Sequence, residues 1–441
     1  MTGKVGFISL GCPKALVDSE QLLTALTAEG YTTADDYSEA DVVVVNTCGF
    51  IDAAIEESFD AIEEALDACG KVVVTGCLGA RKDSLQERYP ELLSVSGPQD
   101  PVPVVDAVRA HVPLSAAEST HYHLGPAGVK LTPAHYAYLK VAEGCNHTCS
   151  FCIIPSMRGK LRSRALPDLL EEADRLAEVG VEELLVISQD TSAWGTDLRR
   201  SELRGLKPGE ALELLCRELA ARFPWVRLHY LYPYPHVDQL LDLMAEGCLL
   251  PYLDVPLQHA DPAILKAMRR PAAAQNTLDR LARWRDRCPE VSVRSTFIVG
   301  FPGEGQREFE TLLEFLEAAE LDRVGCFAYS NVAGAGANNL PDQVPEPVKQ
   351  ERIERLMTLQ ARISREKLAR KVGQELEVIV DAVEDSLALG RTRFDAPDVD
   401  GVVRVHGGRS LVPGERTWVR ITGSDTHDLD ADYVGNPLKF A

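Results

Sequence analysis

Three cysteines stand close together in one short segment of the chain, where they could act as metal ligands. Cys145, Cys149 and Cys152 follow the spacing C-x3-C-x2-C, which can bring three thiolates around one small loop. A structural zinc site normally has four protein ligands, and iron–sulfur clusters are commonly held by four cysteines. Three close ligands, here named the loop cysteines, therefore favour an iron–sulfur cluster in which one iron stays open for chemistry.

His147 offers a second interpretation of the same loop. With the three thiolates it could complete a Cys3His zinc site. Adjacent residues in so tight a loop rarely all point inward, so the spacing favours the iron–sulfur cluster over zinc.

Cys12, Cys48 and Cys77 each fall two residues after an expected strand, and we name them the sheet-edge cysteines. A βαβ pattern implies a parallel sheet, whose strands end at one common edge. This placement predicts a second three-cysteine metal site, although buried core cysteines are a common alternative. The pattern has expected strands at 5–10, 42–46 and 72–75, and helices at 17–29 and 51–68. The remaining cysteines are expected to be structural: Cys69, Cys216, Cys248, Cys288 and Cys326.

The loop cysteines follow the first of six further strand-like segments. A linker is expected at 113–133, and six β/α units predict an open (β/α)6 barrel, with the cysteine loop at its catalytic edge. Gln189 and Gln258 end the second and fourth strands, and Gly300 ends a later one, so all three should lie near the barrel mouth. His259 could also orient a ligand there, but a structural histidine is at least as common. The six strands are expected to begin near residues 136, 183, 226, 252, 291 and 323.

The C-terminal part changes character after a charged helix at 346–371. Five short strand-like segments separated by turn residues predict a compact antiparallel β-barrel. Residues 372–441 hold seven Lys or Arg and thirteen Asp or Glu, which is a net charge of −6. The whole chain has a formal net charge of −21. This negative charge disfavours RNA binding and favours a basic partner.

Length and composition set the remaining expectations. A chain of 441 residues exceeds what one core usually organises, so two or three domains are expected. No apolar run is long enough to span a bilayer and no signal peptide is evident at the start, so we expect a cytoplasmic protein with no membrane partner. Eleven cysteines in such a chain indicate metal binding or catalysis rather than disulfides.

Taken together, these residues resemble the methylthiotransferases, a radical S-adenosylmethionine (SAM) family, over essentially the whole chain. The segment Ser-Leu-Gly-Cys-Pro-Lys at 9–14, followed by Val-Asp-Ser-Glu at 17–20, is similar to the RimO subgroup. The tRNA-modifying subgroup typically carries Gln-Met-Asn after that first cysteine. Other matching segments are Ile-Ile-Pro at 153–155, Arg-Gly at 158–159, Arg-Ser-Arg at 162–164, Asp-Val-Pro-Leu-Gln-His at 254–259 and Met-Arg-Arg at 268–270.

The resemblance implies a domain division and a set of cofactors. It implies an N-terminal methylthiotransferase domain at 1–112, a radical SAM domain at 134–345, a connecting helix at 346–372 and a TRAM domain at 373–441. It also implies two [4Fe–4S] clusters and SAM. The loop cysteines would be catalytic and bind the SAM cluster, and the sheet-edge cysteines would bind an auxiliary cluster. The implied SAM-contacting residues are Phe151, Gln189, Gln258 and Gly300. One departure is Gly-Ala-Gly-Ala at 334–337, where the family usually carries Gly-Thr.

The RimO subgroup methylthiolates the β-carbon of an aspartate in small-subunit ribosomal protein S-twelve. The resemblance thus implies a basic protein substrate, met free or on the ribosome, and an electron donor such as flavodoxin or ferredoxin. tRNA binding is not favoured, because the acidic tail repels phosphate. Two alternatives stay open: a tRNA adenosine methylthiotransferase, and a non-enzymatic iron–sulfur or zinc protein that binds ribosomes or transfers electrons.

Overall fold

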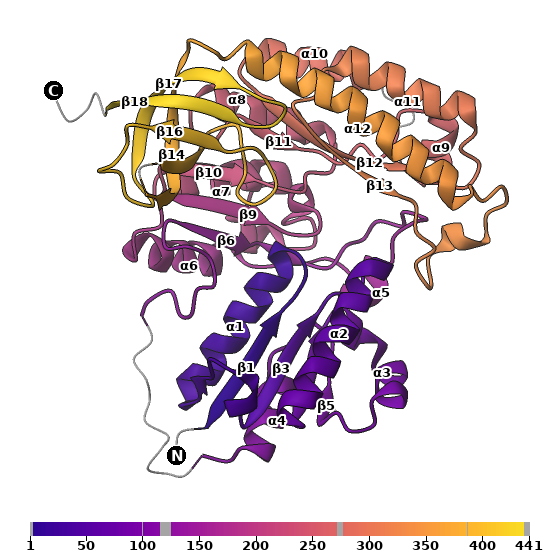
Figure 1. Cartoon of the computed structure of the whole chain (residues 1–441), viewed down its shortest axis with the longest axis vertical. Helices are drawn as coiled ribbons and strands as arrows, with labels where there is room; N and C mark the ends of the chain where they lie inside the picture. The colour runs from indigo at the N-terminus through magenta and orange to yellow at the C-terminus, as the bar shows by residue number, and fades with distance from the viewer. Residues whose placement is uncertain (1–2, 99, 115–124, 271–276, 386, 436–441) are drawn as a thin grey trace.

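The computed structural model describes residues 3–98, 100–114, 125–270, 277–385 and 387–435. An N-terminal α/β domain lies against a central barrel, and a small C-terminal barrel packs on the other side (Figure 1). Within the described part of the chain, no helix has both the length and the apolar character needed to cross a membrane.

The N-terminal domain is a five-stranded parallel sheet with the order β2-β1-β3-β4-β5. Helices cover both faces, because the strands are apolar on both sides. The strands are β1 (Lys4–Ser9), β2 (Thr32–Thr33), β3 (Val42–Thr47), β4 (Val72–Gly76) and β5 (Ser94–Val95). The helices are α1 (Pro13–Glu29) and α4 (Val102–His111) on one face, and α2 (Asp52–Cys69) and α3 (Lys82–Arg88) on the other.

The central barrel has the six expected strands in two parallel three-stranded sheets, β10-β9-β6 and β11-β12-β13. The sheets meet where Leu231 N–H donates to the Asp254 carbonyl at 2.8 Å. The strands are β6 (Tyr136–Lys140), β9 (Glu183–Ile187), β10 (Trp225–Leu228), β11 (Tyr252–Asp254), β12 (Ser292–Val299) and β13 (Arg323–Ala328). The helices around them are α6 (Leu166–Glu178), α7 (Pro208–Ala220), α8 (Leu240–Ala245), α9 (Pro262–Ala267), α10 (Thr277–Arg287) and α11 (Gln306–Ala319). The prediction of an open (β/α)6 barrel is confirmed.

The segment after β6 holds an additional pair of strands that the sequence did not indicate. β7 (Ala142–Glu143) and β8 (Arg162–Ser163) pair antiparallel and close the base of the cysteine loop. Between them lies one short helix, α5 (Ile154–Arg158). The loop is therefore anchored at both ends.

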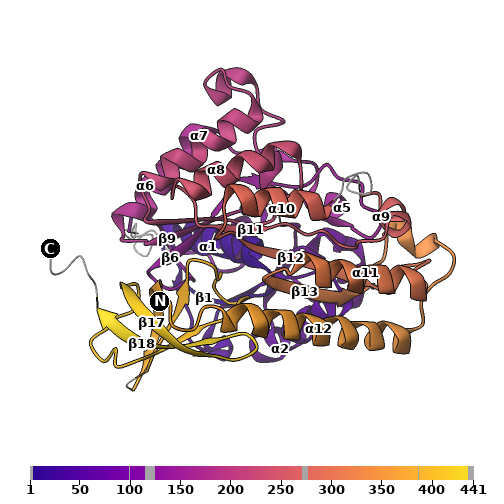
Figure 2. The ribbon, with the colours of Figure 1, turned by 90° about the horizontal axis from the view of Figure 1, so that it is seen from above.

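The C-terminal part begins with α12 (Glu346–Ala369), which lies alongside β13 (Figures 1 and 2). A closed barrel follows, with the order β14-β15-β16-β18-β17. Four of its five strand pairs are antiparallel as expected, but β16 and β18 pair parallel. The parallel pair arises because β17 crosses to the far side and pairs with β14, so the barrel closes through β18. Its strands are β14 (Glu375–Glu384), β15 (Leu387–Thr392), β16 (Val403–His406), β17 (Arg416–Ser424) and β18 (Leu429–Gly435).

Candidate functional site

The loop cysteines occupy a loop closed by backbone contacts. Cys145 N–H donates to the Gly159 carbonyl at 3.1 Å, just inside the β7–β8 pair. The turn before it needs Gly144, which has φ +78°, because a Cβ there would lie 2.2 Å from the Lys160 carbonyl oxygen. Local backbone geometry thus fixes where the first thiol begins.

Each loop sulfur accepts a hydrogen bond from a nearby N–H group. His147 N–H donates to Cys145 Sγ and Ile154 N–H to Cys152 Sγ, both at 3.4 Å, and Arg270 Nη1 lies 3.8 Å from Cys149 Sγ. Hydrogen bonds to sulfur are one of the means by which proteins tune iron–sulfur clusters.

Burial raises the pKa of two of these thiols, Cys145 and Cys152, and that of Cys152 to about 12. A buried thiolate is costly without a positive charge beside it. A bound iron supplies such a charge and deprotonates its thiol ligands outright. A cation bound beside these thiols would therefore stabilise their thiolate forms.

His147 is held away from a ligand role by three other side chains. Its Nε2 lies 2.8 Å from Asp190 Oδ2 and 3.0 Å from Tyr234 Oη, and its ring stacks on Tyr232 at 3.9 Å between centroids. Among the described residues, no three His, Cys, Asp or Glu side chains are close enough to hold one metal ion. The contacts of His147 with Asp190 and Tyr234 therefore favour the iron–sulfur interpretation of the loop over a Cys3His zinc site.

The sheet-edge cysteines come together at the carboxyl edge of the N-terminal sheet. Cys12 precedes α1, Cys48 directly follows β3, and Cys77 directly follows β4. Burial, with smaller contributions from the neighbouring Cys12 and Cys48, raises the pKa of Cys77 to about 11 against the opposing charge of Arg158. The backbones of the three cysteines also lie close together: a Cβ on Gly11, next to Cys12, would lie 3.6 Å from Cys48 Sγ, and a Cβ on Gly49, next to Cys48, would lie 2.9 Å from the Cys77 carbonyl carbon.

Two of the predicted SAM-contacting residues show polar groups at the barrel mouth. Gln189 donates from Nε2 to Glu143 Oε1 at 2.8 Å, while its buried Oε1 has no partner among the described residues. Gln258 has φ +73° and bridges to Phe297. Arg270 Nε is also buried without a described partner. An unpaired acceptor and an unpaired donor near the loop cysteines fit a polar ligand that carries both amino and carboxylate groups.

The other two predicted residues lie in packed surroundings. Phe151 packs against a buried group that includes Met268, Phe301 and Tyr329. Gly300 has φ +70°, and a Cβ there would lie 2.3 Å from Lys349 Cγ. Lys349 from α12 thus occupies the space that the glycine leaves, and the role of Gly300 in SAM binding stays a prediction. His259, buried, accepts from Asp261 N–H through Nδ1 at 3.0 Å, which is a structural arrangement.

The segment that departs from the family pattern touches both cysteine sites. Ala337 N–H donates to the Ser150 carbonyl at 2.8 Å, next to the loop cysteines. Ala335 packs with Cys77, Ile153 and the side chain of Met157. The small residues at 334–337 therefore form part of the wall between the two sites.

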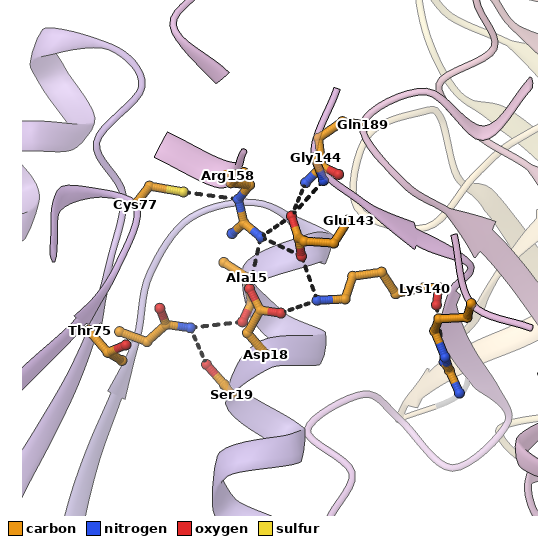
Figure 3. Close-up of polar contacts among 12 residues, drawn as sticks. Ala15, Asp18, Ser19, Thr75, Cys77, Lys140, Glu143, Gly144, Arg158 and Gln189 are labelled. Atoms are coloured by element: carbon orange, nitrogen blue, oxygen red, sulfur yellow. Dashed lines mark hydrogen bonds and ion pairs between the residues drawn. The ribbon is translucent and has the colours of Figure 1, made fainter. Parts of the chain in front are cut away.

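A buried ionic network, which we name the interdomain network, links the N-terminal domain at Cys77 with the barrel at Gln189 (Figure 3). Asp18 comes from α1, Lys140 and Glu143 from the barrel, and Arg158 from α5. Lys140 Nζ donates to Asp18 and also to Glu143 Oε2, the latter at 2.8 Å. Sequence reasoning assigned no role to these residues. The sequence signals were Lys140 in an otherwise apolar strand and the family-matching segments at 17–20 and 158–159, which hold Asp18 and Arg158.

Each of the three parts of the chain matches a known protein family or domain. Residues 139–316 match the radical SAM superfamily, residues 4–97 match the uncharacterized protein family UPF0004, and residues 372–434 match the TRAM domain. The structure of the radical S-adenosylmethionine methyltransferase TsrM from Kitasatospora setae, with cobalamin and a [4Fe–4S] cluster bound, is similar with a TM-score of 0.51. The two are 14% identical, over 74% of this chain and 75% of that one, so this likeness concerns the fold alone.

Full-length relatives carry one common name, ribosomal protein uS12 methylthiotransferase RimO. The protein from Alkalilimnicola ehrlichii is 58% identical over 97% of this chain and 97% of its own. The one from Xanthomonas axonopodis pv. citri is 58% identical, over 97% and 94% of the two chains. The one from Aeromonas salmonicida is 55% identical, over 98% of each. With its radical SAM barrel, its N-terminal three-cysteine domain and its TRAM domain, the chain belongs to the RimO family of radical SAM methylthiotransferases.

Proposed function

We propose that this protein adds a methylthio group to the β-carbon of an aspartate in ribosomal protein uS12, the small-subunit protein S-twelve. The observation that carries the proposal is the 55–58% identity, over nearly the whole chain, to proteins named for that activity. Membership of the radical SAM superfamily implies SAM and one [4Fe–4S] cluster, which makes the protein a SAM-dependent transferase.

The loop cysteines Cys145, Cys149 and Cys152 would hold that first cluster. Bound there together with SAM, the cluster would supply one-electron radical chemistry, which can remove hydrogen from a carbon too weakly acidic for acid–base catalysis. The chain's own part is to place SAM and shield it. Gln189 and Gln258 would orient SAM at the mouth, and the apolar packing around Phe151 excludes water there.

The sheet-edge cysteines Cys12, Cys48 and Cys77 would hold the second cluster. Three thiols leave one iron open, at which a sulfur donor can bind. These cysteines lie across the interdomain network from the barrel mouth. That position supports a second cluster with a separate role, because the substrate carbon must meet both the hydrogen-abstracting group and the sulfur.

The charge of the C-terminal barrel supports a basic protein substrate over tRNA. Its basic side chains are largely engaged with acids: Arg404 contacts Asp425, Asp428 and Asp430 within 3.1 Å. Arg420 pairs with Glu375 at 2.6 Å. Arginines neutralised in this way are poorly placed to meet phosphates. We propose that the protein works in the cytoplasm on uS12, with a flavodoxin or ferredoxin as electron donor.

A reconstituted assay tests the proposed function. Anaerobically prepared protein receives SAM, a reductant and sulfide, together with either uS12 or unmodified tRNA, and the products are read by mass spectrometry. We expect a methylthio group on one uS12 aspartate, lost in Cys145→Ala and Cys77→Ala and retained in the control Cys248→Ala. Modification of tRNA alone would instead establish the tRNA-modifying alternative. Protein that binds only zinc and leaves SAM intact would contradict both.

A further inference from the structure

Arg158 joins the two cysteine sites through a single short helix. It ends α5 and lies six residues after Cys152, one of the loop cysteines. Its side chain is 2% exposed, yet it reaches across to the N-terminal domain. Few charged side chains are buried to this degree unless they are paired.

The guanidinium of Arg158 bonds to both domains at once (Figure 3). Its Nε donates to Cys77 Sγ at 3.2 Å, and its Nη1 donates to Asp18 Oδ2 at 3.0 Å and to Glu143 at 3.1 Å. Glu143 in turn accepts from Gln189 Nε2 at 2.8 Å. One chain of hydrogen bonds therefore runs from the barrel mouth through Glu143 and Arg158 to a sheet-edge sulfur.

One donor of this guanidinium has no partner. Arg158 Nη2 is buried and makes no hydrogen bond to any described residue. The guanidinium is a rigid planar fork, in which the Nε–H bond and one Nη2–H bond point the same way and bind paired acceptors. Because Nε points at Cys77, the free Nη2 donor faces the same side, where the auxiliary cluster would lie.

The charges around Arg158 hold it in the ionised form and in this orientation. Asp18 and Glu143 supply two negative charges, and Lys140, bonded to both, supplies the second positive one. An arginine remains charged in proteins. Its Nη1 side is saturated by these carboxylates, so the Nε and Nη2 side is left for sulfur.

We propose that Arg158 is a positioning residue for the auxiliary cluster, whose Nε and Nη2 donate to Cys77 and to a second sulfur of the cluster. This inference rests on the proposed function, because it requires the second cluster. A positive charge and hydrogen bonds at the sulfurs favour the reduced, more negative state, so Arg158 raises the reduction potential of that cluster. Its carboxylate partners also fix the distance between the two sites.

The test uses the full chain with Cys145, Cys149 and Cys152 replaced by Ala, which leaves only the sheet-edge site. Iron, sulfide and the midpoint potential are measured by redox titration with electron paramagnetic resonance. We expect Arg158→Gln to shift the potential to more negative values, and Arg158→Lys, which keeps the charge but not the fork, to lie between it and the parent.

Arg227→Gln is the matched control. Arg227 is also fully buried, pairs with Glu183 at 2.8 Å and has an unpartnered Nη2, but it lies over the Tyr252 ring. Its replacement should leave the potential unchanged and show what the loss of a buried arginine does to the thermal midpoint.

The possible outcomes separate the inference from the proposed function. A parent that binds no iron would overturn the second cluster and with it the proposed function. A parent that binds the cluster, with its potential unaltered in both Arg158 variants, would overturn the role of Arg158 alone. An equal shift of the midpoint potential in Arg227→Gln would also overturn the role of Arg158, because any buried arginine would then have this effect. If Arg158→Gln fails to fold, Arg158→Lys decides, because an unshifted potential there contradicts the proposal.

Discussion

At the scale of single residues, the two sets of three cysteines differ from the remaining cysteines in their surroundings. Cys216 and Cys288 are buried in the barrel core, and Cys69 donates from Sγ to the Ala40 carbonyl at 3.2 Å. The division of the cysteines into ligands and structural residues was predicted from loop spacing and strand ends, and it stays a prediction. Arg158 and Asp18 both lie in segments that match the family, but their contact was not predictable, because the two residues lie 140 positions apart in the chain.

His147 provides a residue-scale test of metal identity. Since its ring is held by Asp190 and Tyr234 rather than by a metal, we expect His147→Ala to keep the full iron content of the reconstituted protein. Iron analysis and the absorption spectrum check this, with Cys149→Ala as the variant that loses one cluster. If His147→Ala lost iron as Cys149→Ala does, the assignment of His147 as a non-ligand would be wrong.

Asp254 gives a second residue-scale prediction, in the acid range. Burial opposes its ionisation, but a hydrogen bond from His229 and the charge of Arg294 hold its pKa at about 2. Because the pKa is lowered in the fold, the ionised carboxylate stabilises the folded state by about 2 kcal/mol at pH values above the ordinary pKa near 3.8. This stabilisation is lost as the pH falls towards 2.

We therefore expect Asp254→Asn to lower the thermal midpoint of the iron-free protein at pH 6. The gap from wild type should shrink as pH falls below about 4. Differential scanning fluorimetry across this range measures the gap. A gap that stays constant or widens in acid would show that Asp254 is not ionised in the fold at neutral pH.

At the scale of elements, the cysteine loop depends on the antiparallel pair of β7 and β8. The sequence predicted β6 and the loop, but not this pair, because two-residue strands leave no periodic pattern to detect. The sequence likewise predicted five strands for the C-terminal barrel without the parallel pairing of β16 and β18. Strand pairing depends on which edges meet in space, which periodicity does not encode.

Gly144 tests the turn that starts the loop. We expect Gly144→Ala to reduce stability by more than about 1 kcal/mol and to lower cluster occupancy, because the new methyl group would meet the Lys160 carbonyl oxygen. The matched control is Gly180→Ala, which also has positive φ but no atom within 4 Å of the new Cβ. The thermal midpoint and the iron content are measured for both variants and compared. Equal losses in both variants would mean that backbone strain alone matters at Gly144.

At the scale of the whole molecule, the C-terminal barrel is docked on the central barrel through buried charges. Arg391 of β15 pairs with Glu183 of β9 at 2.8 Å and with Asp381 of β14 at 2.8 Å. Tyr252 Oη also donates to Asp400 Oδ2 at 2.6 Å. The two barrels therefore form one packed unit. The sequence indicated the two barrels but not this contact, because each charged residue in isolation fits a solvated surface equally well.

Glu183 tests this docking. Glu183→Gln leaves Arg227 and Arg391 with a buried charge that is no longer balanced, which costs about 3–5 kcal/mol. The control is Glu246→Gln, which removes an exposed pair with Arg217 and should cost less than about 1 kcal/mol. Thermal unfolding of both variants gives the comparison. Similar midpoints would show that the buried pairs do not hold the barrels together.

The central claim is that the chain methylthiolates uS12 with two cysteine sites. The most direct measurement is mass spectrometry of uS12 from ribosomes of a bacterial strain that lacks its own methylthiotransferase for this protein and produces this chain instead. We predict a methylthio group on one aspartate with the wild-type chain, and none with Cys77→Ala or Cys145→Ala. Unmodified uS12 from cells in which the wild-type chain carries both clusters would contradict the account.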